Sequence, residues 1–239
     1  MLLLVSKRRL CAAALLGLAA LLLARLAPAA APSASGHPQV IRRVPTAARV
    51  VALTFDDGPD PGYTPAILTL LERYHARATF FVLGQEAVRH PGLLRRITAQ
   101  GSEIGLHGFS HRAFTALSGS LLARELSRSR QAVQRATGTV PALVRPPYGK
   151  VDGKVLAELA ALGYRAVLWS TDTRDWRRPG SRAIARAAVR DLSPGEILLF
   201  HDGGGDRSQT LQALSVLLPD LAERGYRCLT VSQMLRRGG

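Results

Sequence analysis

Residues 50–58 read Val-Val-Ala-Leu-Thr-Phe-Asp-Asp-Gly, a run of strand-forming residues that ends in two aspartates and a glycine. The run lacks polar alternation, which predicts a strand buried on both faces, as in a parallel sheet covered by helices. Two acids before a glycine most often form a turn. Two adjacent carboxylates, however, oppose each other's ionisation unless a cation or metal lies near. The stretch therefore predicts a parallel α/β fold with chemically active residues at a strand's carboxyl end.

The rest of the chain repeats this alternation of short strand patterns and longer helical patterns. Further strands are predicted over residues 79–83, 103–106, 142–144, 165–169, 197–200 and 226–229. The spacing of apolar residues predicts helices over residues 63–75, 91–100, 121–136, 154–162, 182–191 and 210–224, with a short last helix from Ser232. Seven strands that interleave with helices predict an α/β fold with a parallel sheet. The count alone leaves an open sheet and a closed barrel as alternatives.

Polar residues suited to chemistry directly follow five of these strands. They are Asp56-Asp57-Gly58, the pair His107 and His111, Arg145-Pro146-Pro147-Tyr148-Gly149, Asp172-Thr173-Arg174-Asp175-Trp176, and His201-Asp202. In a parallel α/β barrel the carboxyl ends of all strands face one way, and active sites lie there. We therefore expect these five segments, which are far apart in the sequence, to meet at one mouth of the domain.

His107 and His111 have the spacing of a metal site. Histidines at positions i and i+4 place two imidazoles on one face, as in known zinc helices. With one carboxylate they would make three protein ligands and leave a position for water, which is typical of catalytic zinc, whereas structural zinc is closed by four ligands. The candidate set contains no cysteine, which argues against a structural zinc site.

Three other residues of these segments also have ordinary structural interpretations. Arg145 fits a surface salt bridge, although the proline pair that follows it would hold Tyr148 in one place. Trp176, one of two tryptophans, fits either a core position or the wall of a pocket. His201 follows an apolar strand and fits either a hydrogen-bonded strand end or a site residue. The residues alone leave these alternatives open.

The N-terminus has the pattern of an export signal. Three cations at residues 7–9 precede an apolar run of 15 residues, 10–24, and small residues follow it. The run is short for a spanning helix, which needs about 20 residues. Arg25 could nevertheless reach the interface and leave an uncleaved anchor. Cleavage and retention of this segment therefore both stay open.

These features divide the chain into three parts. We predict a signal peptide or N-terminal membrane anchor over residues 1–31, a linker rich in proline, alanine and serine over residues 32–48, and one catalytic domain over residues 49–239. Either fate of the first segment places the domain outside, secreted or held at the outer face of the cytoplasmic membrane or the cell wall. Export would leave Cys228 as the domain's one cysteine, so we expect no internal disulfide.

The chain of 239 residues is strongly basic. Its formal net charge of +15 falls to +11 once the four cations of residues 1–31 are removed. A basic exported domain is attracted to anionic envelope material. The arginines are scattered, without aromatic interleaving or a nucleic-acid motif, so we expect no nucleic-acid partner. We expect a monomer.

Taken together, the five segments resemble those of the polysaccharide deacetylases, the carbohydrate esterase family 4 enzymes that share the rhizobial chitooligosaccharide-deacetylase homology domain. The family's five motifs occur in order: Thr54-Phe55-Asp56-Asp57-Gly58, His107-Gly108-Phe109-Ser110-His111, Arg145-Pro146-Pro147-Tyr148-Gly149, Asp172-Thr173-Arg174-Asp175-Trp176 and Leu199-Phe200-His201. The resemblance covers residues 49–235 and is highly specific. It implies a distorted (β/α)7 barrel, similar to a TIM barrel, and removal of N-acetyl groups from an amino-sugar polymer such as peptidoglycan or chitin.

The resemblance also implies roles in the chemistry. Asp57, His107 and His111 resemble the ligands of a divalent metal, usually Zn²⁺ and sometimes Co²⁺ or Ni²⁺ in this family. Such a metal activates a water and polarises the acetamide carbonyl. Asp56 resembles the general base, and Arg145 resembles the arginine that orients this base and keeps it ionised.

Further motif residues resemble the substrate side of such a site. The backbone N–H of Tyr148 would help to hold the tetrahedral oxyanion. His201 resembles the general acid that protonates the leaving amine, and Asp175 would hold it charged and oriented. Leu199 and Trp176 resemble the apolar groove that receives the acetyl methyl group. The products would be acetate and a free amino sugar.

The second motif departs from the family pattern, which commonly has Ser or Thr after the first histidine and Pro after the second. Gly108 and Arg112 stand at these positions. The missing hydroxyl predicts a less firmly held ligand loop, with the ligand atoms themselves unchanged. Two other functions stay open: an O-acetyl esterase acting on xylan or an envelope glycan, and a non-catalytic glycan-binding domain. The complete set of motif residues speaks against the second of these.

Overall fold

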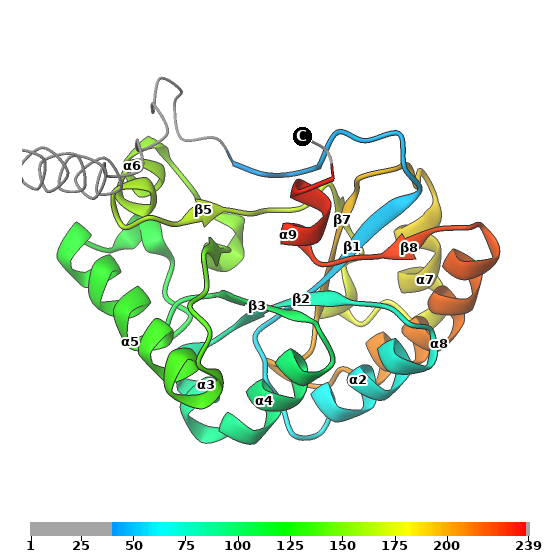
Figure 1. Cartoon of the computed structure of the whole chain (residues 1–239), viewed down its shortest axis with the longest axis horizontal. Coiled ribbons are helices and arrows are strands. Elements are labelled where there is room, and N and C mark those ends of the chain that lie inside the picture. Colours follow the sequence, from blue (N-terminus) through cyan, green and yellow to red (C-terminus); the bar gives the residue numbers. More distant parts are fainter. Residues whose placement is uncertain (1–39, 238–239) are drawn as a thin grey trace, which may run out of the picture. The chain divides into compact units, whose positions relative to one another are not determined.

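Strands and helices alternate through residues 40–237, the part of the chain that the computed structural model describes (Figure 1). The strands are β1 (Val50–Asp56), β2 (Ala78–Val82), β3 (Glu103–Leu106), β4 (Leu143–Val144), β5 (Arg165–Ala166), β6 (Thr171–Asp172), β7 (Ile197–His201) and β8 (Arg227–Cys228). The α-helices are α2 (Thr64–Arg73), α3 (Gly84–Arg89), α4 (Pro91–Ala99), α5 (Gly119–Thr137), α6 (Gly153–Ala161), α7 (Ser181–Val189), α8 (Ser208–Glu223) and α9 (Val231–Leu235). Three short 3-10 helices are η1 (Phe114–Ala116), η2 (Pro147–Gly149) and η3 (Asp175–Arg177).

The named strands form one parallel sheet with β1 near its centre. The order is β5-β4-β3-β2-β1-β7-β6, and β8 also pairs with β1. Every residue of β1 is buried, as expected for a parallel strand that lies between helices and the barrel interior. The ring of Phe55 stacks on Phe80 of β2 at 5.0 Å between centroids and contacts Phe200 of β7 at 5.8 Å.

Of the fifth predicted strand, over residues 165–169, only the first two residues form a strand, and a separate strand, β6, follows at Thr171–Asp172. β5 pairs with β4 at one end of the sheet, and β6 pairs with β7 at the other end. Between them, Val167 N–H donates to the carbonyl of Val144 at 2.9 Å, and Ser170 N–H donates to Ile197 at 3.0 Å. This segment therefore crosses between the two edges. The predicted distorted parallel barrel is confirmed, with eight short strands among residues 40–237 where the sequence predicts seven.

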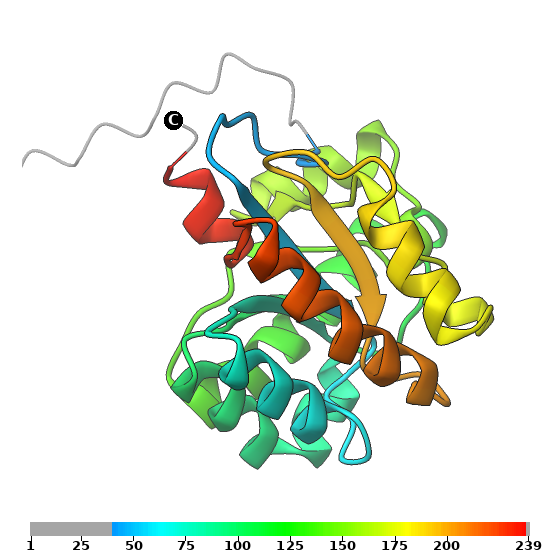
Figure 2. The ribbon, with the colours of Figure 1, turned by 90° about the vertical axis from the view of Figure 1, so that its right-hand side faces the viewer.

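Helices cover the outer side of the sheet (Figures 1 and 2). α8 packs against both α2 and α7, as seen where these helices run side by side in Figure 2. Their apolar faces, with Leu68 of α2 and Leu214 of α8, join the sheet in the main hydrophobic core. Within residues 40–237, no helix has the length and apolar character needed to cross a membrane.

α3 was not predicted from the sequence. It has six residues and begins with a glycine, so no helical pattern of useful length precedes α4. The N–H groups of Gly84 and Gln85 at its start donate to the carbonyls of Gly108 and Phe109 at 2.9 and 3.1 Å. The helix thus supports the loop that follows β3.

The predicted segment 1–31 and the first residues of the predicted linker lie outside the described residues. The end of the linker lies along the barrel. Ile41 pairs with Val167, and buried Val44 donates its N–H to the carbonyl of Gly195 at 2.9 Å. The domain boundaries stay a prediction.

Candidate active site

A pocket of about 390 Å³ opens at the carboxyl ends of the strands. It brings together eight of the ten predicted site residues: Asp56, Asp57, His107, His111, Tyr148, Trp176, Leu199 and His201. The other two, Arg145 and Asp175, lie behind the pocket wall and are fully buried. The segments meet because the carboxyl ends of neighbouring parallel strands lie at the same edge of the sheet, as where Asp56 of β1 is in register with His201 of β7.

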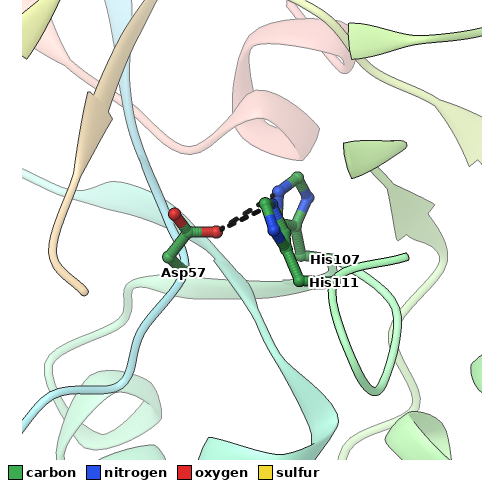
Figure 3. Close-up of side chains that lie close together, drawn as sticks. All are labelled: Asp57, His107 and His111. Atoms are coloured by element: carbon green, nitrogen blue, oxygen red, sulfur yellow. Dashed lines mark ion pairs between the residues drawn. The ribbon is translucent and has the colours of Figure 1, made fainter. Parts of the chain in front are cut away.

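Asp57, His107 and His111 face one another across this pocket (Figure 3). Asp57 Oδ1 lies 3.5 Å from His107 Nε2 and 3.3 Å from His111 Nε2. One ligand atom from each residue lies within 4.8 Å of the others. Asp57 Oδ1 is buried and has no hydrogen-bond partner among residues 40–237. Since an unpartnered buried carboxylate oxygen is costly, the three side chains fit a cation held between them.

His107 is hydrogen-bonded in a way that would suit a neutral metal ligand. Its Nδ1 lies 2.6 Å from the carbonyl oxygen of Arg145, which can only accept a hydrogen bond. Nδ1 therefore carries the proton, and Nε2 presents its lone pair to the pocket. Burial lowers the pKa of His107 to about 3, although the charge of Asp57 opposes this. At neutral pH a proton would not compete with a metal for this nitrogen.

Three site residues have a left-handed backbone. The φ angles are 73° for Asp57, 60° for His111 and 62° for Tyr148. This conformation costs a residue with a Cβ about 1–2 kcal/mol. It persists where the surrounding structure holds it, which is common at functional sites.

A glycine-rich loop after β7 packs closely on Asp57. A Cβ on Gly203 would lie 2.4 Å from the backbone oxygen of Asp57, and one on Gly204 would lie 2.8 Å from its Oδ2. Buried Arg207 holds this loop by donating from Nε to Gly203 O at 2.7 Å and from Nη2 to Gly204 O at 3.0 Å. The sequence reasoning missed Arg207. The glycine run before Arg207 indicates a tight loop, but no pattern in the neighbouring sequence indicates that this loop packs on Asp57.

Asp202 is a second buried group that the sequence reasoning left without a role. It accepts a hydrogen bond from Thr64 Oγ1 at 2.5 Å, and its N–H donates to the carbonyl of Asp56 at 3.1 Å. Burial raises the pKa of Asp202 to about 7. Its contacts join the loop after β7 to the end of β1 and the start of α2.

Asp56 and Arg145 form a buried ion pair beside the triad of Asp57, His107 and His111. Arg145 Nη1 donates to Asp56 Oδ1 at 2.7 Å and to Thr54 Oγ1 at 2.8 Å, and Nη2 donates to Leu168 O at 3.0 Å. Burial raises the pKa of Asp56 and outweighs the lowering effect of Arg145. The second oxygen, Oδ2, lies 3.8 Å from His107 Nε2, so it faces the space that the triad encloses.

His201 and Asp175 form a separate pair, in which both carboxylate oxygens of Asp175 accept hydrogen bonds. His201 Nδ1 donates to Asp175 Oδ1 at 2.8 Å, and Asp175 Oδ2 accepts from the His201 N–H and from Thr210 Oγ1, each at 2.8 Å. Burial alone would lower the pKa of His201, but the hydrogen bond and charge of Asp175, helped by Asp56 and Asp57, raise it above its usual value. Nε2 is left as the ring nitrogen available to the pocket.

The remaining wall of the pocket is apolar and aromatic. Leu199 is buried on β7, whereas Trp176 on η3 is 45% exposed. Tyr148 is 62% exposed, and its ring centroid lies 4.5 Å from that of His111. Trp169 also lines the pocket, although the sequence reasoning did not select it. These side chains give the pocket an exposed aromatic rim above a buried leucine.

Comparison of the sequence with known proteins finds polysaccharide deacetylases. The sequence profile of the polysaccharide deacetylase family matches residues 43–167. A peptidoglycan-N-acetylglucosamine deacetylase of Bacillus cereus is 42% identical over 195 residues, which cover 81% of this chain and 91% of that protein. A chitooligosaccharide deacetylase of Sinorhizobium fredii is 40% identical over 200 residues, covering 78% and 93%.

Comparison of the fold with solved structures finds the same family as comparison of the sequence. The solved structure of the Bc1960 peptidoglycan N-acetylglucosamine deacetylase superposes with a TM-score of 0.80 at 31% identity, over 82% of this chain and 92% of that one. The resemblance predicted from the five motifs is therefore confirmed. On the similarity of both sequence and structure, this chain belongs to the polysaccharide deacetylase family.

Proposed function

We propose that this chain is a metal-dependent hydrolase that removes N-acetyl groups from an amino-sugar polymer, of the peptidoglycan or chitin type, and releases acetate. The peptidoglycan-N-acetylglucosamine and chitooligosaccharide deacetylases to which it is similar support this substrate class. The observation that carries the proposal is the buried Oδ1 of Asp57, which has no hydrogen-bond partner within residues 40–237 and faces the Nε2 atoms of His107 and His111.

Asp57, His107 and His111 would hold one divalent cation. We propose Zn²⁺, with Co²⁺ or Ni²⁺ able to replace it. Two imidazole nitrogens and one carboxylate oxygen suit zinc, and three protein ligands leave a position open, as in catalytic sites. When bound, the cation would lower the pKa of a water molecule and polarise the acetamide carbonyl.

Asp56 would act as the general base and take a proton from the attacking water. Its Oδ2 is the available oxygen, because Oδ1 already accepts from Arg145. Burial raises the pKa of Asp56 and so brings it closer to the range in which a general base works best. Arg145, held by two other acceptors, would keep the carboxylate in its orientation.

His201 would act as the general acid and protonate the leaving amine. Nδ1 is bound to Asp175, so the proton would come from Nε2. The raised pKa of His201 favours the charged form that this role needs. The backbone N–H of Tyr148, placed after two prolines, would help to hold the oxyanion.

The acetyl methyl group would lie against Leu199 and Trp176. Leu199 supplies a buried apolar surface, and the exposed face of Trp176 offers a platform for a sugar ring. The polymer would then cross the aromatic rim of the pocket and place one acetamide in it.

The domain over residues 49–239 would work outside the cell membrane. The sequence pattern of residues 1–31 supports this as a signal peptide or membrane anchor, and residues 32–48 would link it to the domain. The substrate named for the Bacillus relative, a cell-wall polymer, is consistent with such a location. We propose that the enzyme is monomeric and has no nucleic-acid partner.

Acetate release is the direct test of this function. We expect release from peptidoglycan or chitin oligomers, loss of release with a chelator, and recovery on addition of Zn²⁺. Release from O-acetylated xylan alone would instead identify an O-acetyl esterase. Glycan binding without any acetate release would identify a binding domain.

A further inference from the structure

The loop that carries both histidine ligands, residues 107–111, adopts a backbone that needs outside support. Gly108 has a φ of 81° and His111 has a φ of 60°, so two of the five residues are left-handed. Gly108 has no side chain to contribute, and a non-glycine residue holds such a φ only where its surroundings fix it. The groups that hold this loop therefore decide where the two Nε2 atoms lie.

One carboxylate, that of Glu125 on α5, binds the amide side of the loop. Its Oε2 accepts from the N–H of Phe109 and from the N–H of Ser110, both at 2.9 Å. Its Oε1 accepts from the hydroxyl of Ser110 at 3.0 Å. Hydrogen bonds from backbone amides to a carboxylate are shorter and stronger than neutral ones. Because Ser110 directly precedes His111, these bonds fix the backbone at the second ligand.

The carbonyl side of the same loop is bound by α3. The N–H groups of Gly84 and Gln85 donate to the carbonyls of Gly108 and Phe109. Arg128, one turn further along α5, places its guanidinium carbon 3.6 Å from the centroid of the Phe109 ring. The peptide groups between the ligands are thus bonded on both sides. Glu125 is the one acidic side chain among these hydrogen-bond partners.

We propose that Glu125 is a positioning residue for the metal site. It fixes the loop between His107 and His111 and thereby raises the affinity of the site for a divalent cation. The inference rests on the proposed function, since it concerns the same metal ligands. It assigns a role to a side chain that lies outside all five sequence motifs and that touches neither the pocket nor a ligand atom.

The test is the Zn²⁺ affinity of the full chain and of Glu125→Gln, measured by competition with a chromophoric chelator. Gln has the same size but no charge. We expect affinity to fall by about 10- to 100-fold, the usual effect of losing a group that supports metal ligands. Ser110→Ala removes one of the three donors and should weaken binding less. Glu223→Gln, at the exposed end of α8, is the matched control and should bind as the wild type does.

Two further readouts separate positioning from general stability. The absorption spectrum of the Co²⁺-loaded protein reports ligand geometry, and it should change in Glu125→Gln but not in Glu223→Gln. A lower melting temperature of metal-free Glu125→Gln with unchanged Zn²⁺ affinity would overturn the proposal. If Glu125→Gln does not fold, Ser110→Ala decides by the same measurements. Wild-type protein that binds no Zn²⁺ would overturn the proposed function too, whereas equal binding by wild type and Glu125→Gln would overturn only the positioning role.

Discussion

The two halves of the pocket contain similar side chains, histidine and aspartate, but differ in how these are bonded. In one half, both oxygens of Asp175 have donors, from His201 and from Thr210. In the other half, Asp57 Oδ1 is buried without a hydrogen-bond partner in the described part of the chain, and it faces the Nε2 atoms of His107 and His111. In the first half the chain itself supplies a donor to each carboxylate oxygen, whereas in the second half the described residues supply none to Asp57 Oδ1.

This difference separates two kinds of preorganisation. A carboxylate with all its donors in place keeps its geometry with no ligand bound. A buried carboxylate without a partner destabilises the fold until a cation neutralises it. We call Asp57, His107 and His111 the metal half of the pocket, and His201 with Asp175 the acid half. Zn²⁺ should therefore raise both the stability and the activity of the protein through the metal half. The acid half should influence turnover and leave metal affinity unchanged.

The largest effect should come from removing the metal half. Asp57→Ala or His107→Ala should abolish Zn²⁺ retention and reduce kcat/KM by roughly 10³-fold or more, because the activated water is lost. The fold should persist, since Asp57 Oδ1 makes no hydrogen bond to any of residues 40–237 that Asp57→Ala would break. Bound zinc by elemental analysis, acetate release and circular dichroism check these points. Full activity in either variant would remove the metal from the mechanism.

Removing the acid half should lower the turnover rate and leave Zn²⁺ affinity unchanged. His201→Ala should lower kcat by about 10²-fold or more, the usual contribution of a general acid, while Zn²⁺ affinity stays within about twofold of wild type. Initial rates of acetate release and a Zn²⁺ competition titration measure the two quantities. If His201→Ala lowers kcat and Zn²⁺ affinity by the same factor, the acid half also takes part in metal binding.

A smaller effect is expected from weakening the acid half through Asp175→Asn. Asp175 helps to raise the pKa of His201, so its loss should lower that pKa, and the general acid should lose its proton at a lower pH. The alkaline limb of the kcat profile should move to lower pH, with a fall of about tenfold in kcat near neutrality. Asp191→Asn, an exposed substitution just after the C-terminal end of α7, should leave the profile unchanged. A profile that does not move in Asp175→Asn would contradict the pairing.

The smallest effect concerns the stability of the metal-free protein in acid. Folded His107 takes up a proton near pH 3, whereas the unfolded residue does so near its ordinary value of 6.5. Between these values the unfolded state binds more protons, so stability should fall as the pH falls, by up to about 1.4 kcal/mol per pH unit from this group. Urea unfolding at pH 7 and pH 5 should show a steeper loss for wild type than for His107→Gln. If wild type and His107→Gln lose the same stability between pH 7 and pH 5, His107 is not held neutral in the folded protein.

The positions of the reacting groups could be predicted from the sequence because a parallel sheet imposes them. Buried apolar strands are easy to recognise, and whatever follows each one must lie at the same edge. Asp56 and His201 illustrate this, since they are far apart in the sequence and in register in the sheet. The pocket follows from the pattern of strands and polar ends.

The supports of those groups could not be predicted in this way. Glu125 contacts the histidine loop from the middle of a helix, and Arg207 holds glycine carbonyls beside Asp57. Both contacts depend on how loops fold back on the barrel, which leaves no local periodicity. The shortening of the predicted strand 165–169 has the same origin, because the chain from Arg165 to Asp172 crosses from β4 at one end of the sheet to β7 at the other.

The most direct test of the account is anomalous diffraction at the zinc edge from crystals of the zinc-loaded full chain. We predict one peak, about 2.0–2.2 Å from Nε2 of His107, Nε2 of His111 and one carboxylate oxygen of Asp57. No peak at these residues, or a peak held by other side chains, would contradict the central claim that this triad binds the ion.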